Sequence, residues 1–400
     1  MAVAENNLLR SEAADRARLL DDLHYDVALD LTGDATFRSE TRLRCRAVES
    51  GPGTFLDLTA VRVESASVNG EPVAADAYDA ESGRLRISGL RAENEIVVVA
   101  EHAYEHTGVG LHRFVDPVDG AVYLHTQFEP FDAHRVFPCF DQPDLKATFS
   151  FEVEAPAGWE VVSNGAVSDR PADGAAGRWR FATTEKMSTY ITALVAGPYH
   201  SVHRRHSPGG SGVSPENTIE MGLYCRQSLA RYLDADEIFD VTAAGFDFFE
   251  DAFGQPYAFG KYDQLFVPEF NFGAMENAGC VTFSERHIFR SKVTEAEREA
   301  RADTILHEMA HMWFGDLVTM RWWDDLWLNE SFATYASYLG LVEATRFTSA
   351  WASFANALKT WAYRQDQLPS THPIVADAPD IETMKTNFDG ITYAKGASVL

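Results

Sequence analysis

The stretch TILHEMAHMWFG, residues 304–315, places two histidines four positions apart, with a glutamate directly after the first of them. Residues four apart on an α-helix share one face, so His307 and His311 can both reach one ion about 2 Å from each ring nitrogen. Residues 294–315 carry acids in their first turn and end at Gly315, a pattern typical of a long helix. The stretch therefore predicts a metal-binding helix, and neutral imidazole favours zinc.

A catalytic zinc needs a third protein ligand and an open position for water. Glu330, 19 positions after His311, stands near the start of a second predicted helix over residues 324–347. A short connection and an antiparallel second helix would carry this carboxylate back to the two histidines. Glu343 is another acid on that helix, toward its far end. Glu308 is expected beside the metal without binding it, as a general base that passes a proton from water to the leaving amine.

The composition narrows the class of protein. The chain has 400 residues, which predicts two or three domains, and its Lys and Arg number 34 against 60 Asp and Glu, a net charge of −26. A surface this acidic disfavours nucleic acid and anionic lipid as partners. The four cysteines form no C-x-x-C pair, and neither a signal-peptide core nor a run of about 18 apolar residues occurs. We therefore expect a cytoplasmic protein that does not enter a membrane.

The pattern of the chain changes near residue 200. Before it, strand-like runs alternate wet and apolar positions, as in TRLRCRAV at residues 41–48, and Asn69-Gly70 indicates a tight hairpin. We interpret residues 1–200 as an antiparallel β domain, residues 201–218 as a junction loop, and residues 219–400, where helical patterns dominate, as the catalytic domain. The chain stops at TYAKGASVL inside a predicted helix without a stop signal, so we expect a truncated catalytic domain and a longer natural protein.

Five motifs in order resemble the aminopeptidase N family of zinc metallo-aminopeptidases, a gluzincin family. They are the histidine pair with its later glutamate, NFGAMENAG at residues 271–279, FEPFDAHRVFPCFDQPDLKATF at 128–149, WWDDLWLNESFATYAS at 322–337 and TYAKGASVL. The resemblance implies an α+β multidomain fold: an N-terminal antiparallel β saddle, then a thermolysin-like α/β zinc domain. It also implies a partner domain, the family's helical C-terminal domain that closes over the cleft, which we expect to be missing from this chain.

The resemblance also implies roles for individual residues. Glu276 should bind the α-amino group of the substrate, with Gln127 and Glu129 around that amine and the first side chain. Tyr393 should hydrogen-bond the tetrahedral intermediate. Phe272 should line the pocket for the first side chain, although core packing is an equal alternative for it. The implied substrate-binding set is Gln127, Glu129, Phe272, Gly273, Ala274, Met275, Glu276 and Asn277.

The motifs together predict a zinc aminopeptidase of the membrane alanyl aminopeptidase type, with one zinc per chain. An α-ammonium near a metal must be paired with carboxylates, because its desolvation is otherwise expensive. Fixing the amine leaves only one peptide carbonyl at the zinc, so residues leave one at a time from peptides with a free N-terminus. The alternatives are a thermolysin-like endopeptidase, an epoxide hydrolase related to leukotriene A4 hydrolase, and an inactive truncated fragment.

Overall fold

The computed structural model describes residues 6–49, 51, 53–209 and 218–400. The chain forms two compact units, one of residues 1–199 with 379–381 and one of residues 200–378 with 382–400. Within the described residues, no helix is both long and apolar enough to cross a lipid bilayer. Residues 201–206, which the sequence places in the junction loop, belong to strand β16 (Tyr199–His206), and residues 210–217 of that loop lie outside the described residues. The strand was missed because its charged residues, usual on an edge strand, resemble a loop.

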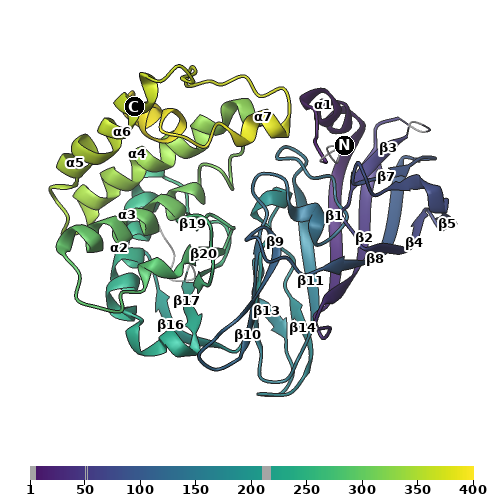
Figure 1. Ribbon diagram of the computed structural model, residues 1–400, viewed down its shortest axis with the longest axis horizontal. Helices are drawn as coiled ribbons and strands as arrows, with labels where there is room; N and C mark the ends of the chain where they lie inside the picture. Colours follow the sequence, from purple (N-terminus) through teal and green to yellow (C-terminus); the bar gives the residue numbers. More distant parts are fainter. Residues whose placement is uncertain (1–5, 50, 52, 210–217) are drawn as a thin grey trace. The chain divides into compact units, whose positions relative to one another are not determined.

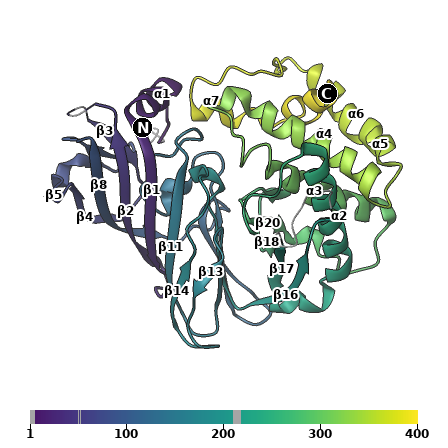
Figure 2. The same cartoon turned by 180° about the vertical axis from the view of Figure 1, so that it is seen from behind.

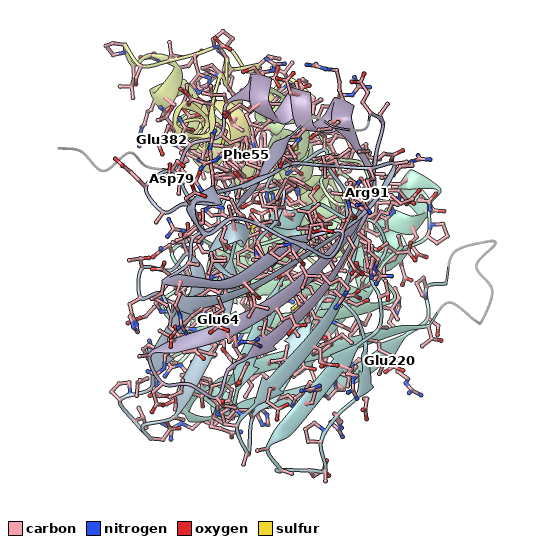
Figure 3. The ribbon with its side chains drawn as sticks, turned by 90° about the vertical axis from the view of Figure 1, so that its right-hand side faces the viewer. Phe55, Glu64, Asp79, Arg91, Glu220 and Glu382 are labelled. Carbon is pink, nitrogen blue, oxygen red and sulfur yellow. The ribbon has the colours of Figure 1, made fainter. Side chains whose placement is uncertain are left out.

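An eight-stranded sheet is the largest element of the N-terminal unit (Figure 1). Its strands, in spatial order, are β13 (Val167–Asp169), β14 (Gly177–Phe181), β11 (Ala147–Ala155), β1 (Leu20–Asp30), β2 (Thr36–Ala47), β8 (Glu93–Ala103), β4 (Arg62–Val68) and β5 (Glu71–Pro72). On β2, Leu43 and Cys45 are buried while Arg44 is exposed, so the predicted alternation is confirmed. Figure 3 labels Glu64 on β4, whose carboxylate pairs with Arg38 of β2 at 3.1 Å.

Two smaller sheets complete the strands described in this unit. One contains β12 (Glu160–Ser163), β15 (Leu194–Gly197), β10 (Val122–Gln127) and β9 (Gly110–Val115). The other contains β3 (Thr54–Asp57), β7 (Arg84–Ile87) and β6 (Tyr78–Asp79). The predicted hairpin at Asn69-Gly70 joins β4 and β5.

Two features of this unit differ from the sequence prediction. The large sheet is not wholly antiparallel, because β1 and β11 run parallel with Tyr25 opposite Phe149. These strands are far apart in sequence, and a long crossover of this kind permits parallel pairing. The unit also begins with a helix, α1 (Arg10–Leu19), where only β structure was expected. Half of its residues are charged and few are large and apolar, so they carry little of the apolar periodicity that identifies a helix in a sequence.

The C-terminal unit combines a five-stranded sheet with helices. The strand order is β16, β17 (Ile219–Arg226), β18 (Lys261–Val267), β20 (Cys280–Ser284) and β19 (Ala274–Met275). The pairs β17–β18 and β18–β20 are parallel, and β19 is antiparallel to β20. The helices are α2 (Ala235–Phe253), α3 (Glu295–His311), α4 (Leu326–Ala344), α5 (Ala350–Ser353), α6 (Lys359–Asp366) and α7 (Ile381–Lys385), with π-helical turns at Phe354–Leu358 and Ile391–Lys395.

Helices α2, α3 and α4 lie side by side next to this sheet in both views (Figures 1 and 2). Their inner faces form one apolar core with the strands, including Phe246 of α2, Leu306 of α3 and Phe283 of β20. Gly245 lets α2 and α3 approach closely, because a Cβ there would lie 2.6 Å from Leu306 Cδ2. The packing fixes α3 relative to its neighbours and so fixes where the two histidines point.

Candidate metal centre

Helix α3 starts and ends at points set by its own sequence. Its first turn is closed by a capping box, in which Thr294 Oγ1 accepts from the Glu297 backbone N–H and the Glu297 carboxylate accepts from the Thr294 N–H. The helix ends at His311, four residues before the predicted stop at Gly315. His307 and His311 therefore occupy its last two turns, one above the other.

Three side chains from α3 and α4 converge at one point. The Nε2 atoms of His307 and His311 are 3.1 Å apart, and Glu330 Oε2 lies 3.3 Å from the first and 3.4 Å from the second. Ligand atoms about 2 Å from a tetrahedral ion are spaced about 3.3 Å apart, so this triangle fits zinc. Glu343 is exposed near the end of α4, which leaves Glu330 as the third candidate ligand.

The electrostatics of the triangle also suit a cation. Burial lowers the pKa of His311, but the nearby carboxylates of Glu276, Glu330 and Glu308 outweigh burial and raise it well above its usual value. Burial opposes ionisation of Glu330, yet the two neighbouring imidazoles lower its pKa to about 2. The carboxylates around His311 therefore favour positive charge at this point, which is the environment that a divalent cation needs.

Two further carboxylates face the same histidine. The side-chain oxygens of Glu276 and Glu308 lie within 4.8 Å of one another and of a ring nitrogen of His311. Burial raises the pKa of Glu308 well above its usual range; His311 opposes this, and the charges of Glu276 and Glu330 reinforce it. Burial likewise raises the pKa of Glu276. The centre therefore holds two carboxyl groups, both buried, beside the predicted ligands.

Tyr393 reaches the centre from a different part of the chain. It lies on the π-helical turn at Ile391–Lys395, where Lys395 N–H donates to the Gly390 carbonyl five residues earlier. The hydroxyl of Tyr393 donates to Glu330 Oε1 at 2.9 Å. This contact holds one oxygen of Glu330, while its Oε2 faces the histidines.

Asn329 is a residue of the centre that the sequence analysis did not single out. Its Oδ1 accepts from His311 Nδ1 at 2.6 Å, and its Nδ2 donates to Glu276 Oε1 at 3.3 Å. Gly315 makes room for it, because a Cβ at Gly315 would lie 2.3 Å from Asn329 Oδ1 and the glycine has φ +137°. The position directly before Glu330 was the available signal, but the sequence alone does not show which way that amide points.

The GAMEN stretch forms the edge of the sheet. Ala274 and Met275 make up β19, and Met275 pairs with Thr282 of β20. Asn277 Nδ2 donates to Thr282 Oγ1 at 3.2 Å, which ties the end of the stretch to β20. The neighbouring Gly273 carbonyl accepts from the backbone N–H of Ser284 at 3.0 Å. This pairing aims Glu276 at the centre.

Phe272 is 45% exposed, so the alternative of a core residue is wrong. Its ring contacts that of Phe270, with centroids 6.1 Å apart. Gln127 and Glu129 belong to the N-terminal unit. Gln127 is the last residue of β10, opposite Gly110 of β9, and Glu129 follows two positions later.

Comparison with known proteins assigns both halves of the chain. Residues 22–191 match the peptidase M1 N-terminal domain, and residues 237–400 match the peptidase family M1 domain. A β-rich domain followed by a mixed α/β catalytic domain is thus confirmed as the fold class.

Curated relatives are similar along most of the chain. Aminopeptidase N of Streptomyces lividans is 55% identical over 98% of this chain and 45% of that protein. The tricorn protease-interacting factor F2 of Thermoplasma acidophilum is 31% identical over 94% of this chain and 46% of its own length. Glutamyl aminopeptidase of Bos taurus is 34% identical over 69% of this chain and 28% of its own length. The chain spans less than half the length of these relatives, and it belongs to the peptidase M1 family.

Proposed function

We propose that the protein is a zinc-dependent aminopeptidase that releases N-terminal residues from peptides one at a time. One observation carries the proposal. Glu276, from the sheet edge, and Glu308, from α3, both lie within 4.8 Å of a ring nitrogen of His311, a member of the candidate metal triangle. One centre thus combines a candidate cation site, a proposed base and a second carboxylate outside the triangle of His307, His311 and Glu330. A second carboxylate is what a free α-ammonium requires when it leaves water.

The proposed ligands are His307, His311 and Glu330, with one zinc per chain. Bound zinc would polarise the substrate carbonyl and bring the pKa of a water molecule toward neutrality. Glu308 takes the proton of the attacking water and returns it to the departing amine. Its buried carboxyl, whose pKa is raised, holds a transferred proton well. Tyr393, already next to Glu330, donates its hydroxyl to the developing oxyanion.

Binding of the substrate's amino terminus is the second half of the proposal. Glu276 pairs with the α-ammonium, Gln127 and Glu129 assist it, and exposed Phe272 contacts the first side chain. Gly273 to Asn277 lie on or beside the edge strand β19, where an extended peptide can add as a further strand. Fixing the amine beside the triangle allows only the first peptide bond to react.

A cytoplasmic location and peptide substrates complete the proposal. The cysteines Cys45, Cys139, Cys225 and Cys280 are all free and buried, which favours a reducing compartment. Of the names that the relatives carry, aminopeptidase N and glutamyl aminopeptidase support removal of N-terminal residues. None of the contacts described above favours the epoxide hydrolase alternative over peptide hydrolysis.

The proposal is tested by comparing a leucyl peptide with the same peptide acetylated at its amino terminus, both incubated with the zinc-loaded protein. We expect stepwise release of residues from the free peptide. We expect no cleavage of the blocked one, because its neutral amide cannot pair with Glu276. Equal cleavage of both peptides, or cuts at internal bonds, would support the endopeptidase alternative and reject an aminopeptidase. The Glu308→Gln variant is the control for a contaminating peptidase.

A further inference from the structure

Asn329 connects the candidate metal centre to the proposed amine-binding carboxylate. It lies on α4 directly before Glu330 and is 2% exposed, so its amide must find partners within the protein. Both ends of the amide do so, because Oδ1 meets His311 Nδ1 and Nδ2 meets Glu276 Oε1. A single side chain therefore touches one predicted metal ligand and the carboxylate expected to recognise the substrate.

The surroundings fix which end of the amide points where. His311 Nδ1 faces the carbonyl oxygen of Phe314 at 3.1 Å as well as Asn329. A carbonyl can only accept, so Nδ1 carries the proton and the Asn329 atom opposite must be oxygen. The NH₂ group then points at Glu276 Oε1, which accepts from it at 3.3 Å. The two contacts agree on one orientation, which leaves His311 Nε2 as the nitrogen that faces His307 and Glu330.

The chain makes room for this arrangement. At Gly315, where φ is +137°, an added Cβ would meet Asn329 Oδ1 at 2.3 Å and His311 Nδ1 at 3.3 Å. Any side chain at that position would push the amide away from the imidazole. The glycine after α3 therefore serves the contact between the two helices as well as the turn.

We propose that Asn329 is a positioning residue that orients His311 for the metal through its oxygen and orients Glu276 for the substrate's α-ammonium through its nitrogen. The second half rests on the function proposed above. Hydrogen-bonded partners behind a metal-binding histidine fix its tautomer and ring orientation, and their loss weakens metal affinity about 10–100-fold. The amide donor holds Glu276 Oε1 in place, so the carboxyl group stays oriented toward the position proposed for the ammonium group.

Two substitutions separate the two contacts. Asn329→Ala removes both, so zinc affinity, measured without peptide by competition with a chromophoric chelator, should fall about 10–100-fold. Asn329→Asp keeps an acceptor for His311 but loses the donor to Glu276. We expect that variant to bind zinc at least as tightly as the natural protein. Its KM for an aminoacyl amide with a free amine should rise about tenfold, because a hydrogen bond to a charged group is replaced by like-charge repulsion.

A double-mutant cycle with Glu276→Ala tests the coupling. In that background, Asn329→Ala should still weaken zinc binding but should raise KM no further. The matched control is Gln264→Ala, which removes another buried amide. Gln264 lies on β18, and its Nε2 donates to Thr242 Oγ1 at 2.9 Å. The control should lose stability without losing zinc affinity.

Three results would overturn the inference. If Asn329→Ala binds zinc with unchanged affinity, the proposed role of Asn329 in orienting His311 is rejected. If Asn329→Ala and Gln264→Ala lose the same zinc affinity, the effect is general destabilisation of the fold. The proposed role of Asn329 in orienting Glu276 is rejected if Asn329→Ala and Glu276→Ala each raise KM and their effects multiply in the double variant. A normal KM in Glu276→Ala alone rejects the amine-binding role of Glu276 in the proposed function, and with it the role of Asn329 in orienting Glu276. The zinc measurements still decide whether Asn329 orients His311. Should Asn329→Ala fail to fold, Asn329→Leu, which keeps the bulk of the side chain but lacks both polar groups, carries the zinc comparison, and Asn329→Asp still tests the contact with Glu276.

Discussion

Two glutamates beside one histidine illustrate how position assigns chemistry to residues. Glu308 is fixed by α3 immediately after His307, whereas Glu276 comes from the end of a two-residue edge strand and is held by the Asn329 amide. Both are buried and both have a raised pKa. What distinguishes them is that Glu276 Oε1 accepts a hydrogen bond from the Asn329 amide.

The first prediction concerns Glu308. Glu308→Gln keeps the size and the hydrogen-bonding shape of the side chain but cannot accept a proton. We expect zinc content to remain at one ion per chain while kcat falls about 10²–10⁴-fold, the usual contribution of a general base. Metal analysis and steady-state hydrolysis of a free-amine substrate measure the two quantities. A variant that hydrolyses the substrate at the natural rate would remove Glu308 from the reaction.

A second prediction concerns Asp303, one turn before His307. Burial raises the pKa of Asp303 to about 7, although Ser337 Oγ donates to its carboxylate at 2.7 Å. The folded state therefore keeps this proton at pH values where the unfolded chain has lost it. This contribution to stability is complete below about pH 4 and is lost as pH rises through 7, by at most about 1.4 kcal/mol per pH unit.

Asp303→Asn removes that dependence because an amide does not titrate. We expect the free energy of unfolding of the variant, relative to the natural protein, to improve from pH 4 to about pH 7 in urea titrations and to level off above it. A difference between the two proteins that stays constant over this range would show that Asp303 titrates normally.

At this scale the sequence predicted His307 and His311 as ligands because residues four apart share one face of a helix. It predicted Glu330 because a second, antiparallel helix returns a third ligand to them, and Glu308 because it directly follows His307. The structure brings these side chains together, and their roles stay predictions. Asn329 could not be found in this way. Its importance depends on the direction of one amide and on space left by Gly315, and neither follows from local periodicity.

At the scale of elements, α1 shows how a helix with few large apolar side chains is held. Its Arg16 is buried, with Nη1 donating to Asp57 Oδ2 at 2.6 Å and Nε to Gln142 Oε1 at 2.7 Å. The guanidinium also lies 4.9 Å from the ring centroid of Phe55, which Figure 3 labels. Asp57 accepts in turn from the Asp141 N–H at 3.0 Å. The helix escaped prediction because a buried ion pair, not an apolar stripe, fixes it to the sheets.

The third prediction follows from this ion pair. Arg16→Met keeps the length of the side chain but leaves the Asp57 carboxylate buried without its cation, which should cost about 3–5 kcal/mol of unfolding free energy. Adding Asp57→Asn removes the uncompensated charge and keeps an acceptor for the Asp141 N–H, so the double variant should recover much of the loss. Equal urea midpoints for the natural protein and Arg16→Met would show that the pair contributes nothing.

The elements of the C-terminal unit were predicted better than those of the N-terminal unit. Helices α3 and α4 have long periodic sequences and were predicted, whereas edge strand β16 was taken for a loop. The parallel pairing of β1 with β11 depends on residues more than 120 positions apart, such as Tyr25 and Phe149. No local pattern specifies such a pairing.

At the scale of the whole molecule, the acidic composition and the candidate metal centre both favour binding of cations. A net charge of −26 attracts cations, metal ions included, from a distance. The chain also spans only 45% of its Streptomyces relative, so the activity of the whole protein remains a proposal here.

The fourth prediction concerns metal removal. Zinc at about 100 times its Kd should stabilise the folded protein by about 2.7 kcal/mol, because the triangle of ligands exists only in the fold. Thermal unfolding with zinc and with a chelator measures the shift in Tm. The shift should vanish in His311→Ala. A shift of the same size in that variant would place the stabilising ion elsewhere.

The most direct measurement is a crystal structure of the zinc-loaded protein with a non-hydrolysable peptide analogue that has a free amino terminus, recorded at the zinc absorption edge. The account predicts one anomalous peak about 2 Å from His307 Nε2, His311 Nε2 and the Glu330 carboxylate, with the amino group bonded to Glu276. An ion held by other residues, or an amino group turned away from Glu276, would contradict it.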